Sequence, residues 1–181
     1  MELKLRLYPD PVLLKEAAPV TTFDDAFRER VAEMHRIMYD EGGVGLAAPQ
    51  VGWSVQLLVL NPTGDAEKAD EAMTIVNPKV VKKWGKSTAQ EGCLSFPEIF
   101  IDVARPAGVK LSYQDEFGEQ HEDDLNEFIA RIVQHEKDHL DGVLLYHRMS
   151  PTDRNKYRAH LGELIGAYED MLDAARGDDD E

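Results

Sequence analysis

The sequence is poor in cysteine and has no long hydrophobic run. Its single cysteine, Cys93, cannot form an intramolecular disulfide, which fits a reducing compartment. No window approaches the roughly 18 uninterrupted apolar residues of a membrane-spanning helix. The N-terminal stretch lacks the apolar segment of a signal peptide, and its acidic residues do not suit a transit peptide. These absences predict a cytoplasmic protein without a membrane partner.

Basic residues are also scarce relative to acidic ones. The 181 residues include 20 lysines and arginines against 35 aspartates and glutamates, which gives a formal net charge of −15. A surface of this sign repels polyanions, so we expect neither a direct nucleic-acid partner nor an anionic membrane. The length suits one domain. We expect residues 1–176 to form it and the acidic residues 177–181 to be a disordered tail.

Hydrophobic spacing predicts three helices and several strands. The helices are expected within residues 21–43, over Leu125–Asp141, and from the N-cap Ser150 to about Arg176. Strands are expected within residues 55–62 and 74–81, and a β-hairpin over residues 108–125. The pattern predicts an α+β fold, with antiparallel or mixed strands around the second helix, an N-terminal helix and a long C-terminal helix.

The second predicted helix carries the motif "QHEKDHLDG", residues 134–142. Residues four apart lie on one helix face, so His135 and His139 can bind one metal ion. Phe128 and Ile132 continue their stripe, and Glu136 lies one residue off it, within reach of a water at the metal. This is the HExxH arrangement. The structural alternative is a pair of histidines that cap a core helix, beside a surface glutamate.

A catalytic metal needs a third protein ligand, which the motif does not contain. Where a third histidine would follow in a metzincin, the chain has Leu145, and His147 falls two residues too late. Glu163 on the last predicted helix would make a metallopeptidase of a different class. Cys93 follows a glycine in the loop-like stretch "QEGCLSFPE" and would complete a three-ligand site with an open fourth position. A lone cysteine is also common as a small buried residue.

The stretch "GGVGLAAPQVG", residues 42–52, is rich in glycine. It lacks the Gly-Lys-Ser/Thr ending of a phosphate loop and follows a predicted helix, so we reject nucleotide binding. Its small residues allow the backbone to approach another chain segment or a peptide substrate closely. In the second case, Gln50 could donate a hydrogen bond to a developing oxyanion.

Taken in order, "GVGLAAPQ", "EGCLS" and "QHEKDHLDG" resemble the three signature motifs of the peptide deformylases, and the resemblance covers most of residues 1–155. It implies that Cys93, His135 and His139 bind the metal. The family uses Fe(II) in the cell, and many preparations hold zinc or nickel. It also implies an enzyme that removes the formyl group from N-formyl-methionyl nascent peptides and releases formate. The alternatives are an HExxH metallopeptidase with Glu163 as third ligand and a non-catalytic binding protein.

The same resemblance implies further roles. Glu136 would act as general base and then as general acid, and Gln50 and the backbone N–H of Leu94 would stabilise the oxyanion. The backbone of residues 43–45 would pair with the substrate as an added strand. The remaining implied residues are the substrate-binding Gly43, Val44, Gly45, Phe128 and Ile132, and the supporting ion pair of Glu91 and Arg105.

The chain departs from the family pattern at three places. Glu127 stands where many members have a glycine, at the start of the metal-binding helix. Arg131 lies one turn before His135 and is expected at the rim of the substrate pocket. Members that dock on the ribosome through their last helix use basic residues there, whereas residues 162–181 are strongly acidic here. Ribosome association through that helix is therefore doubtful.

Overall fold

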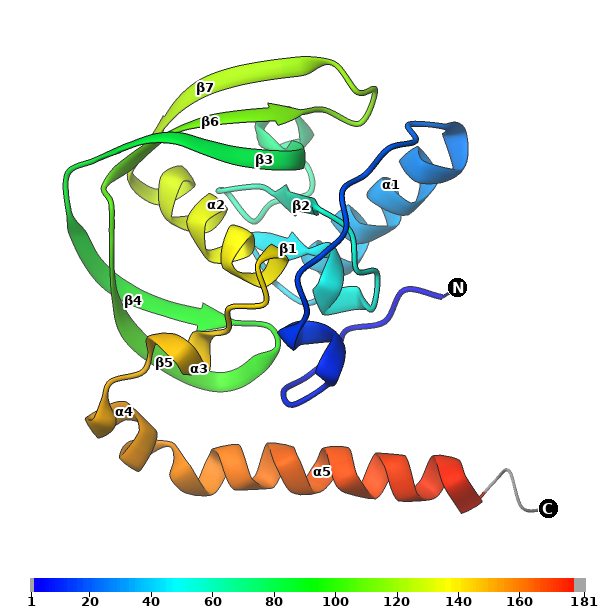
Figure 1. Ribbon diagram of the computed structural model, residues 1–181, viewed down its shortest axis with the longest axis vertical. Coiled ribbons are helices and arrows are strands. Elements are labelled where there is room, and N and C mark those ends of the chain that lie inside the picture. The colour runs from blue at the N-terminus through cyan, green and yellow to red at the C-terminus, as the bar shows by residue number, and fades with distance from the viewer. Residues whose placement is uncertain (1, 178–181) are drawn as a thin grey trace.

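Two antiparallel sheets enclose one helix in the computed structural model, which describes residues 2–177 (Figure 1). The larger sheet has the order β1-β2-β3-β6-β7. Its strands are β1 Gly45–Ala47, β2 Leu57–Leu60, β3 Met73–Trp84, β6 Gly108–Gln114 and β7 Gln120–Asn126. The smaller sheet pairs β4 Ser87–Cys93 with β5 Phe96–Arg105. The helix between the sheets is α2, Glu127–Leu140. The predicted α+β fold with a central helix is confirmed.

Helix α2 is held in place by its apolar residues. Ala130, Ile132, Val133 and Leu140 are buried in one cluster with residues of the large sheet, such as Leu58. Burial of the three larger side chains, Ile132, Val133 and Leu140, stabilises the fold by about 1.5–3 kcal/mol each. The predicted start of this helix, Leu125, is wrong by two residues because Leu125 pairs with Val109 at the end of β7. The packing fixes which face of α2 meets the strands.

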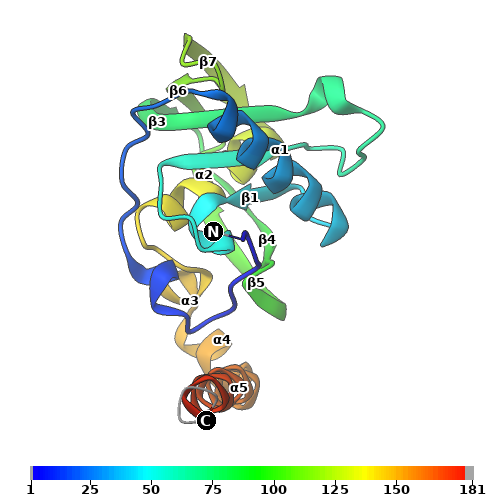
Figure 2. The same ribbon diagram turned by 90° about the vertical axis from the view of Figure 1, so that its right-hand side faces the viewer.

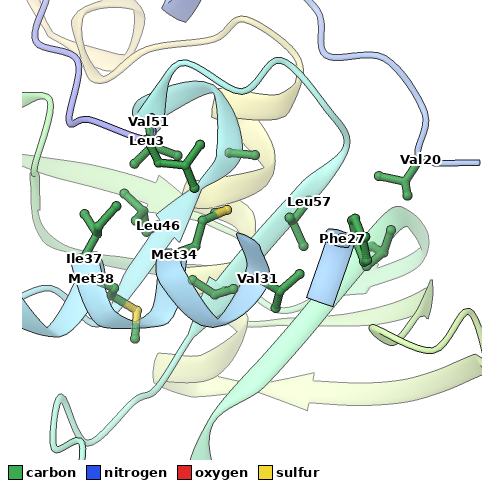
Figure 3. Packing of buried hydrophobic residues seen from close by; sticks show 13 residues of the cluster. Leu3, Val20, Phe27, Val31, Met34, Ile37, Met38, Leu46, Val51 and Leu57 are labelled. Carbon is green, nitrogen blue, oxygen red and sulfur yellow. The ribbon is translucent and has the colours of Figure 1, made fainter. Parts of the chain in front are cut away.

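Helix α1, Asp25–Asp40, covers the other face of β1 and β2 (Figures 1 and 3). The Asp24 side chain caps it by accepting a hydrogen bond of 2.8 Å from the Phe27 N–H. Its buried face includes Val31, Met34 and Met38, which pack against Leu46 and other residues of one cluster. The predicted first helix is confirmed, and its packing fixes the strand that follows the glycine-rich stretch.

The predicted last helix is divided into two. The N-cap Ser150 is confirmed, since its hydroxyl accepts a hydrogen bond of 3.1 Å from the Asp153 N–H. Helix α4, Pro151–Lys156, then ends at Tyr157, whose hydroxyl donates a 2.8 Å hydrogen bond to the Phe100 carbonyl. The elements α3, Leu145–Arg148, and α5, Arg158–Gly177, lie on either side of α4. Helix α5 extends along one side of the molecule (Figures 1 and 2).

Three short 3₁₀ turns complete the description: η1 Pro11–Leu14, η2 Ala48–Val51 and η3 Ala69–Glu71. Gly177, the first residue of the predicted tail, belongs to α5, and residues 178–181 lie outside the described residues. Among the described residues, no helix is both long enough and apolar enough to cross a membrane.

Glu127, at the start of α2, has a positive φ of +53°. This left-handed conformation costs a residue with a side chain roughly 1–2 kcal/mol, whereas glycine adopts it freely. We expect Glu127→Gly to raise the free energy of unfolding by about 1 kcal/mol, because relief of the strain exceeds the added entropy of the unfolded chain. Urea denaturation would measure the change. Glu127→Ala removes the same carboxylate but keeps the strain, so a gain of equal size in that variant would contradict the explanation.

Candidate metal centre

Three potential metal ligands converge where the end of β4 meets α2. The ligand atoms of Cys93, His135 and His139 all lie within 4.8 Å of one another, and the Cys93 sulfur is 3.2 Å from the His139 Nε2. Cys93 is the last residue of β4, so the predicted loop around it is wrong. The pairing of β4 with β5 fixes the position of Cys93, because Cys93 pairs with Phe96 at the turn between the two strands.

The donor set suits a transition metal. One thiolate and two imidazoles are ligands for zinc or Fe(II), and three protein ligands leave a position open for catalysis. Burial lowers the pKa of His139 well below its usual value of 6.5, and the charges of His135 and Arg105 act in the same direction. His139 is therefore neutral, which is the form that binds a metal. The residues present fit the metal that the sequence motif implies.

His135 is oriented by Glu91. The His135 Nδ1 lies 3.0 Å from the Glu91 Oε2. Burial acts to raise the pKa of Glu91, but hydrogen bonds from Arg105 and His135 outweigh it and lower the pKa to about 2. The Glu91 carboxylate is thus ionised and accepts the Nδ1 proton. Carboxylates commonly orient metal-binding histidines in this way. Burial lowers the pKa of His135, but hydrogen bonds with Cys93 and Glu91 outweigh it and raise the pKa well above 6.5. A metal ion that binds the Nε2 of His135 therefore has to displace a proton from it.

Glu136 lies beside the ligands in a nearly dry environment. Its residue is 5% exposed, and its Oε2 is buried with no hydrogen-bond partner among the described residues. Burial raises the pKa of Glu136 to about 7, although the charges of His135 and Arg105 lower it in part. A carboxyl group with such a pKa can both take up and release a proton near neutral pH.

The glycine-rich stretch brings main chain directly against this carboxylate. A Cβ atom on Gly45 would lie 2.6 Å from the Glu136 Oε1 and 2.7 Å from the Ile132 Cγ2. Only glycine therefore allows β1 to approach α2 this closely. We predicted that the backbone of residues 42–52 approaches either another chain segment or a peptide substrate. The approach to another chain segment, helix α2, is observed. The same main chain also lines the adjacent pocket.

Gln50 and Leu94 lie next to Cys93. The Gln50 side chain is held at both ends: its oxygen accepts a 2.9 Å hydrogen bond from the Ala47 N–H, and its nitrogen donates to the Ser95 hydroxyl at 3.2 Å. The same nitrogen is 3.6 Å from the Cys93 sulfur. Leu94 follows Cys93 in the turn and lines the pocket. The geometry thus directs an amide donor toward the ligand cluster.

Glu91 and Arg105 form the ion pair that the sequence suggested. Arg105 donates two hydrogen bonds to the Glu91 carboxylate, of 2.7 and 2.8 Å, and the two side chains are each 5% exposed. Arg131 lines the pocket as expected, and it also donates to the Glu91 Oε1 at 2.6 Å and to the Val103 carbonyl at 2.9 Å. The sequence did not lead us to predict the contact between Arg131 and Glu91. The only sign of it in the sequence was a charged residue on the buried side of a predicted helix.

The sequence also did not lead us to predict that Arg105 pairs with Asp138. Arg105 donates a 2.9 Å hydrogen bond to Asp138, which accepts a further one of 2.7 Å from Arg148. The strand β5 is thereby tied to both ends of the HExxH segment, through Glu91 to His135 and directly to Asp138. The ion pairs fix the histidine helix against the strand pair that carries Cys93.

Removal of the Glu91 charge is expected to destabilise the protein. Glu91→Gln leaves Arg131 without a carboxylate and Arg105 with Asp138 alone, and breaking a buried ion pair costs about 3–5 kcal/mol. We expect the free energy of unfolding to fall by about 3 kcal/mol, as measured by urea denaturation. Glu33→Gln is the control, because the Glu33–Arg36 pair is exposed on α1 and contributes about 1 kcal/mol or less. Equal losses in both variants would contradict the role of burial.

A pocket of about 720 Å³ opens beside the ligand cluster, and Cys93 and His135 are among its lining residues. Its lining includes all five residues expected to bind substrate, namely Gly43, Val44, Gly45, Phe128 and Ile132. Phe128 is 51% exposed and lies at the mouth. Exposed apolar residues that the sequence reasoning missed, Leu7 and Phe100, also line the pocket. The lining of the pocket is therefore mostly apolar.

The alternative third ligand is not near this site. Glu163 lies on α5 with its side chain 75% exposed, 3.2 Å from the His160 Nδ1. Only Cys93 joins the two histidines among the described residues that could complete this cluster. The other group of potential ligands, Asp115, Glu119 and His121, lies at the β6–β7 hairpin. The metallopeptidase arrangement therefore lacks its third ligand.

Comparison with known proteins gives one consistent family. The family model for polypeptide deformylases matches residues 2–155. Peptide deformylase of Chlorobaculum parvum is 43% identical over 165 residues, which cover 91% of this chain and 88% of the relative. A crystal structure of peptide deformylase from Plasmodium falciparum has a TM-score of 0.89 at 41% identity, covering 92% of this chain and 97% of that one. For the enzyme from Legionella pneumophila the TM-score is 0.83 at 36% identity, with 93% and 98% covered.

Proposed function

Since the chain belongs to the peptide deformylase family and removes the N-formyl group from the N-terminal methionine of newly made proteins, we propose that Cys93, His135 and His139 hold its metal ion and that Glu136 carries the proton. The convergence of the three ligand atoms within 4.8 Å supports this assignment most directly. The buried Glu136 carboxylate beside them, with an oxygen that has no partner among the described residues, supports its role.

A metal held by Cys93, His135 and His139 would supply Lewis acidity and would make an attacking water more acidic. Glu136 removes a proton from that water as it attacks the formyl carbon. The Gln50 nitrogen and the Leu94 N–H donate hydrogen bonds to the oxyanion of the tetrahedral intermediate. Glu136 then delivers the proton to the amine of methionine as the carbon–nitrogen bond breaks. The products are formate and a peptide with a free N-terminus.

Substrate binding is assigned to the main chain of β1 and the adjoining pocket. The peptide backbone pairs with residues 43–45 as an added strand, and the absence of a side chain at Gly45 leaves β1 close to Glu136. The methionine side chain lies between Val44 and Ile132, and Phe128 covers the mouth. Glu91 and Arg105 hold His135 in place and do not touch the substrate.

The metal in the cell is proposed to be Fe(II), with zinc or nickel in some preparations. The ligand set accepts all three ions, and the order of intrinsic affinities places Fe(II) below zinc, so occupancy follows supply. The enzyme is proposed to act in the cytoplasm on nascent peptides. Residues 1–176 are proposed to form its single catalytic domain.

Formate release tests the assignment. Protein purified without oxygen and loaded with Fe(II) or nickel is expected to bind one metal ion per chain and to release formate from formyl-Met-Ala-Ser. The same protein should leave the internal peptide bonds of that substrate uncut. Cleavage of internal bonds, or metal-loaded protein that releases no formate, would contradict the proposal.

A further inference from the structure

A second cleft, of about 450 Å³, lies between β3, the end of β5 and the C-terminal half of α2. We call it the β3–α2 cleft. Among the described residues, none lines both this cleft and the substrate pocket. Its volume is within the range of roughly 300–1,000 Å³ that is usual for small-molecule sites. The β3–α2 cleft is therefore large enough for a small molecule that leaves the metal ligands accessible.

The lining of the β3–α2 cleft is strongly basic. Its basic side chains are Lys79, Lys83, Arg105, Lys137 and Arg148, and its acidic ones are Asp138 and Asp141. Five positive and two negative charges leave a net charge of +3, in a chain whose formal net charge is −15. The substrate pocket has the opposite character, since four glutamates but only one arginine line it. A small anion is therefore attracted to the cleft and repelled by the pocket.

Both acidic side chains of the cleft are already paired with cations. Asp141 lies 2.7 Å from the Lys137 ammonium group, and Asp138 lies 2.7 Å from the Arg148 guanidinium group. The two cleft lysines that β3 contributes are exposed, and in residues 2–177 neither of them forms an ion pair. The β3 side of the cleft therefore presents two cations whose charge no acidic side chain offsets.

The cations of the cleft come from different elements. Lys79 and Lys83 belong to β3, Lys137 belongs to α2, and Arg148 is the last residue of α3. Arg105, at the end of β5, is 5% exposed and is already fixed by its hydrogen bonds. An anion in the cleft contacts β3 on one side and the helix of the HExxH segment on the other. It therefore links the large sheet to the helix that carries both histidines.

We propose that the β3–α2 cleft is a binding site for a small bisphosphate anion. Such a molecule carries about −3 to −4 near neutral pH, because each phosphate group contributes roughly −1.5 to −2. This charge matches the +3 of the lining. Lysines bind phosphate as point charges, and arginines present several N–H donors to its oxygens. The bound anion braces α2 against β3. The site rests on the charges of the cleft and not on the family assignment.

Calorimetric titration tests the proposal. Nickel-loaded protein is titrated with fructose 1,6-bisphosphate at low ionic strength, and one molecule is expected to bind per chain. The variant K79Q/K83Q is expected to bind at least tenfold more weakly, because hydrogen bonds to charged groups are each worth about a factor of ten or more in affinity. At ten times the wild-type Kd, the Tm of the wild-type protein should rise by about 3–6 °C. The Tm of the variant should rise by about 1 °C or less at the same concentration.

The matched control is K82Q/K86Q, which removes the same charge from two exposed lysines on or next to β3 that do not line the cleft. It is expected to change the Kd less than threefold. Formate release from formyl-Met-Ala-Ser without the anion should be unchanged in both variants, so that a failure of anion binding is distinguished from a failure of catalysis.

Four outcomes would overturn the proposal. They are no binding to the wild-type protein, equal losses of affinity in both variants, displacement of the bisphosphate by formyl-Met-Ala-Ser, and equally tight binding of citrate. The third outcome would place the anion in the substrate pocket. The fourth would show that the site does not distinguish phosphate from carboxylate.

Discussion

Glu136→Gln is expected to lower kcat/KM for a formyl-methionyl peptide by about 10³-fold. A positioned acid or base contributes roughly 10²–10⁴-fold, and Glu136 is assigned both roles. Glutamine has nearly the same shape, so it preserves packing against Gly45 but can neither accept the proton of the attacking water nor return it to the leaving amine. Steady-state formate release would measure the loss.

Metal content separates a chemical effect from a structural one in this experiment. Glu136 does not bind the metal in our assignment, so the Glu136→Gln variant should still hold one ion per chain. Glu29→Gln, at an exposed position on α1, makes the same chemical change far from the ligands and should retain full activity. A Glu136→Gln enzyme with more than a tenth of wild-type activity would refute the assigned role.

Cys93→Ala is expected to abolish stoichiometric metal binding. Two imidazoles remain, and loss of a thiolate ligand should weaken affinity by more than the roughly 10–100-fold that follows loss of a supporting residue. Activity should fall with occupancy and recover only in part at high metal concentration. Metal analysis after gel filtration, together with formate release, would measure both effects.

Glu163→Gln provides the comparison for Cys93→Ala. The metallopeptidase alternative uses Glu163 as third ligand, so it predicts metal loss in this variant and retention in Cys93→Ala. The structure leads us to expect the opposite, because Glu163 is exposed on α5 beside His160. If both variants retained one metal ion per chain, neither residue would be the third ligand.

Features that depend on local pattern could be predicted from the sequence. The apolar spacing of α1, the N-cap Ser150 and the i, i+4 histidines each depend on residues close in the chain. Strand β4 could not be predicted, because its first four residues are all exposed and show no alternation. Strand β5 does alternate from Ile99 onward, but Pro97 and Glu98 interrupt the pattern near its start, so its signal was overlooked.

The missed contacts of the site depend on tertiary register. Arg131 meets Glu91 because the β4–β5 hairpin packs against α2 in one particular register, which the sequence does not specify. The same holds for Arg105 and Asp138. Similarly, the break between α4 and α5 at Tyr157 accompanies a hydrogen bond to Phe100, 57 residues away in the chain. No proline or glycine at this position indicates the break in the sequence. Family resemblance, rather than periodicity, identified Cys93 as a ligand.

Helix α5 has a consequence for the dynamics of the molecule. Leu161 is its only buried residue among those described, and it lies in the first turn. The remaining helix gains little from tertiary packing, which supplies most of the stability of helices in proteins. Its amide hydrogens beyond the first turns should therefore exchange with solvent at a much lower opening free energy than those of α2. Proteases should trim this end while the metal-binding body stays intact.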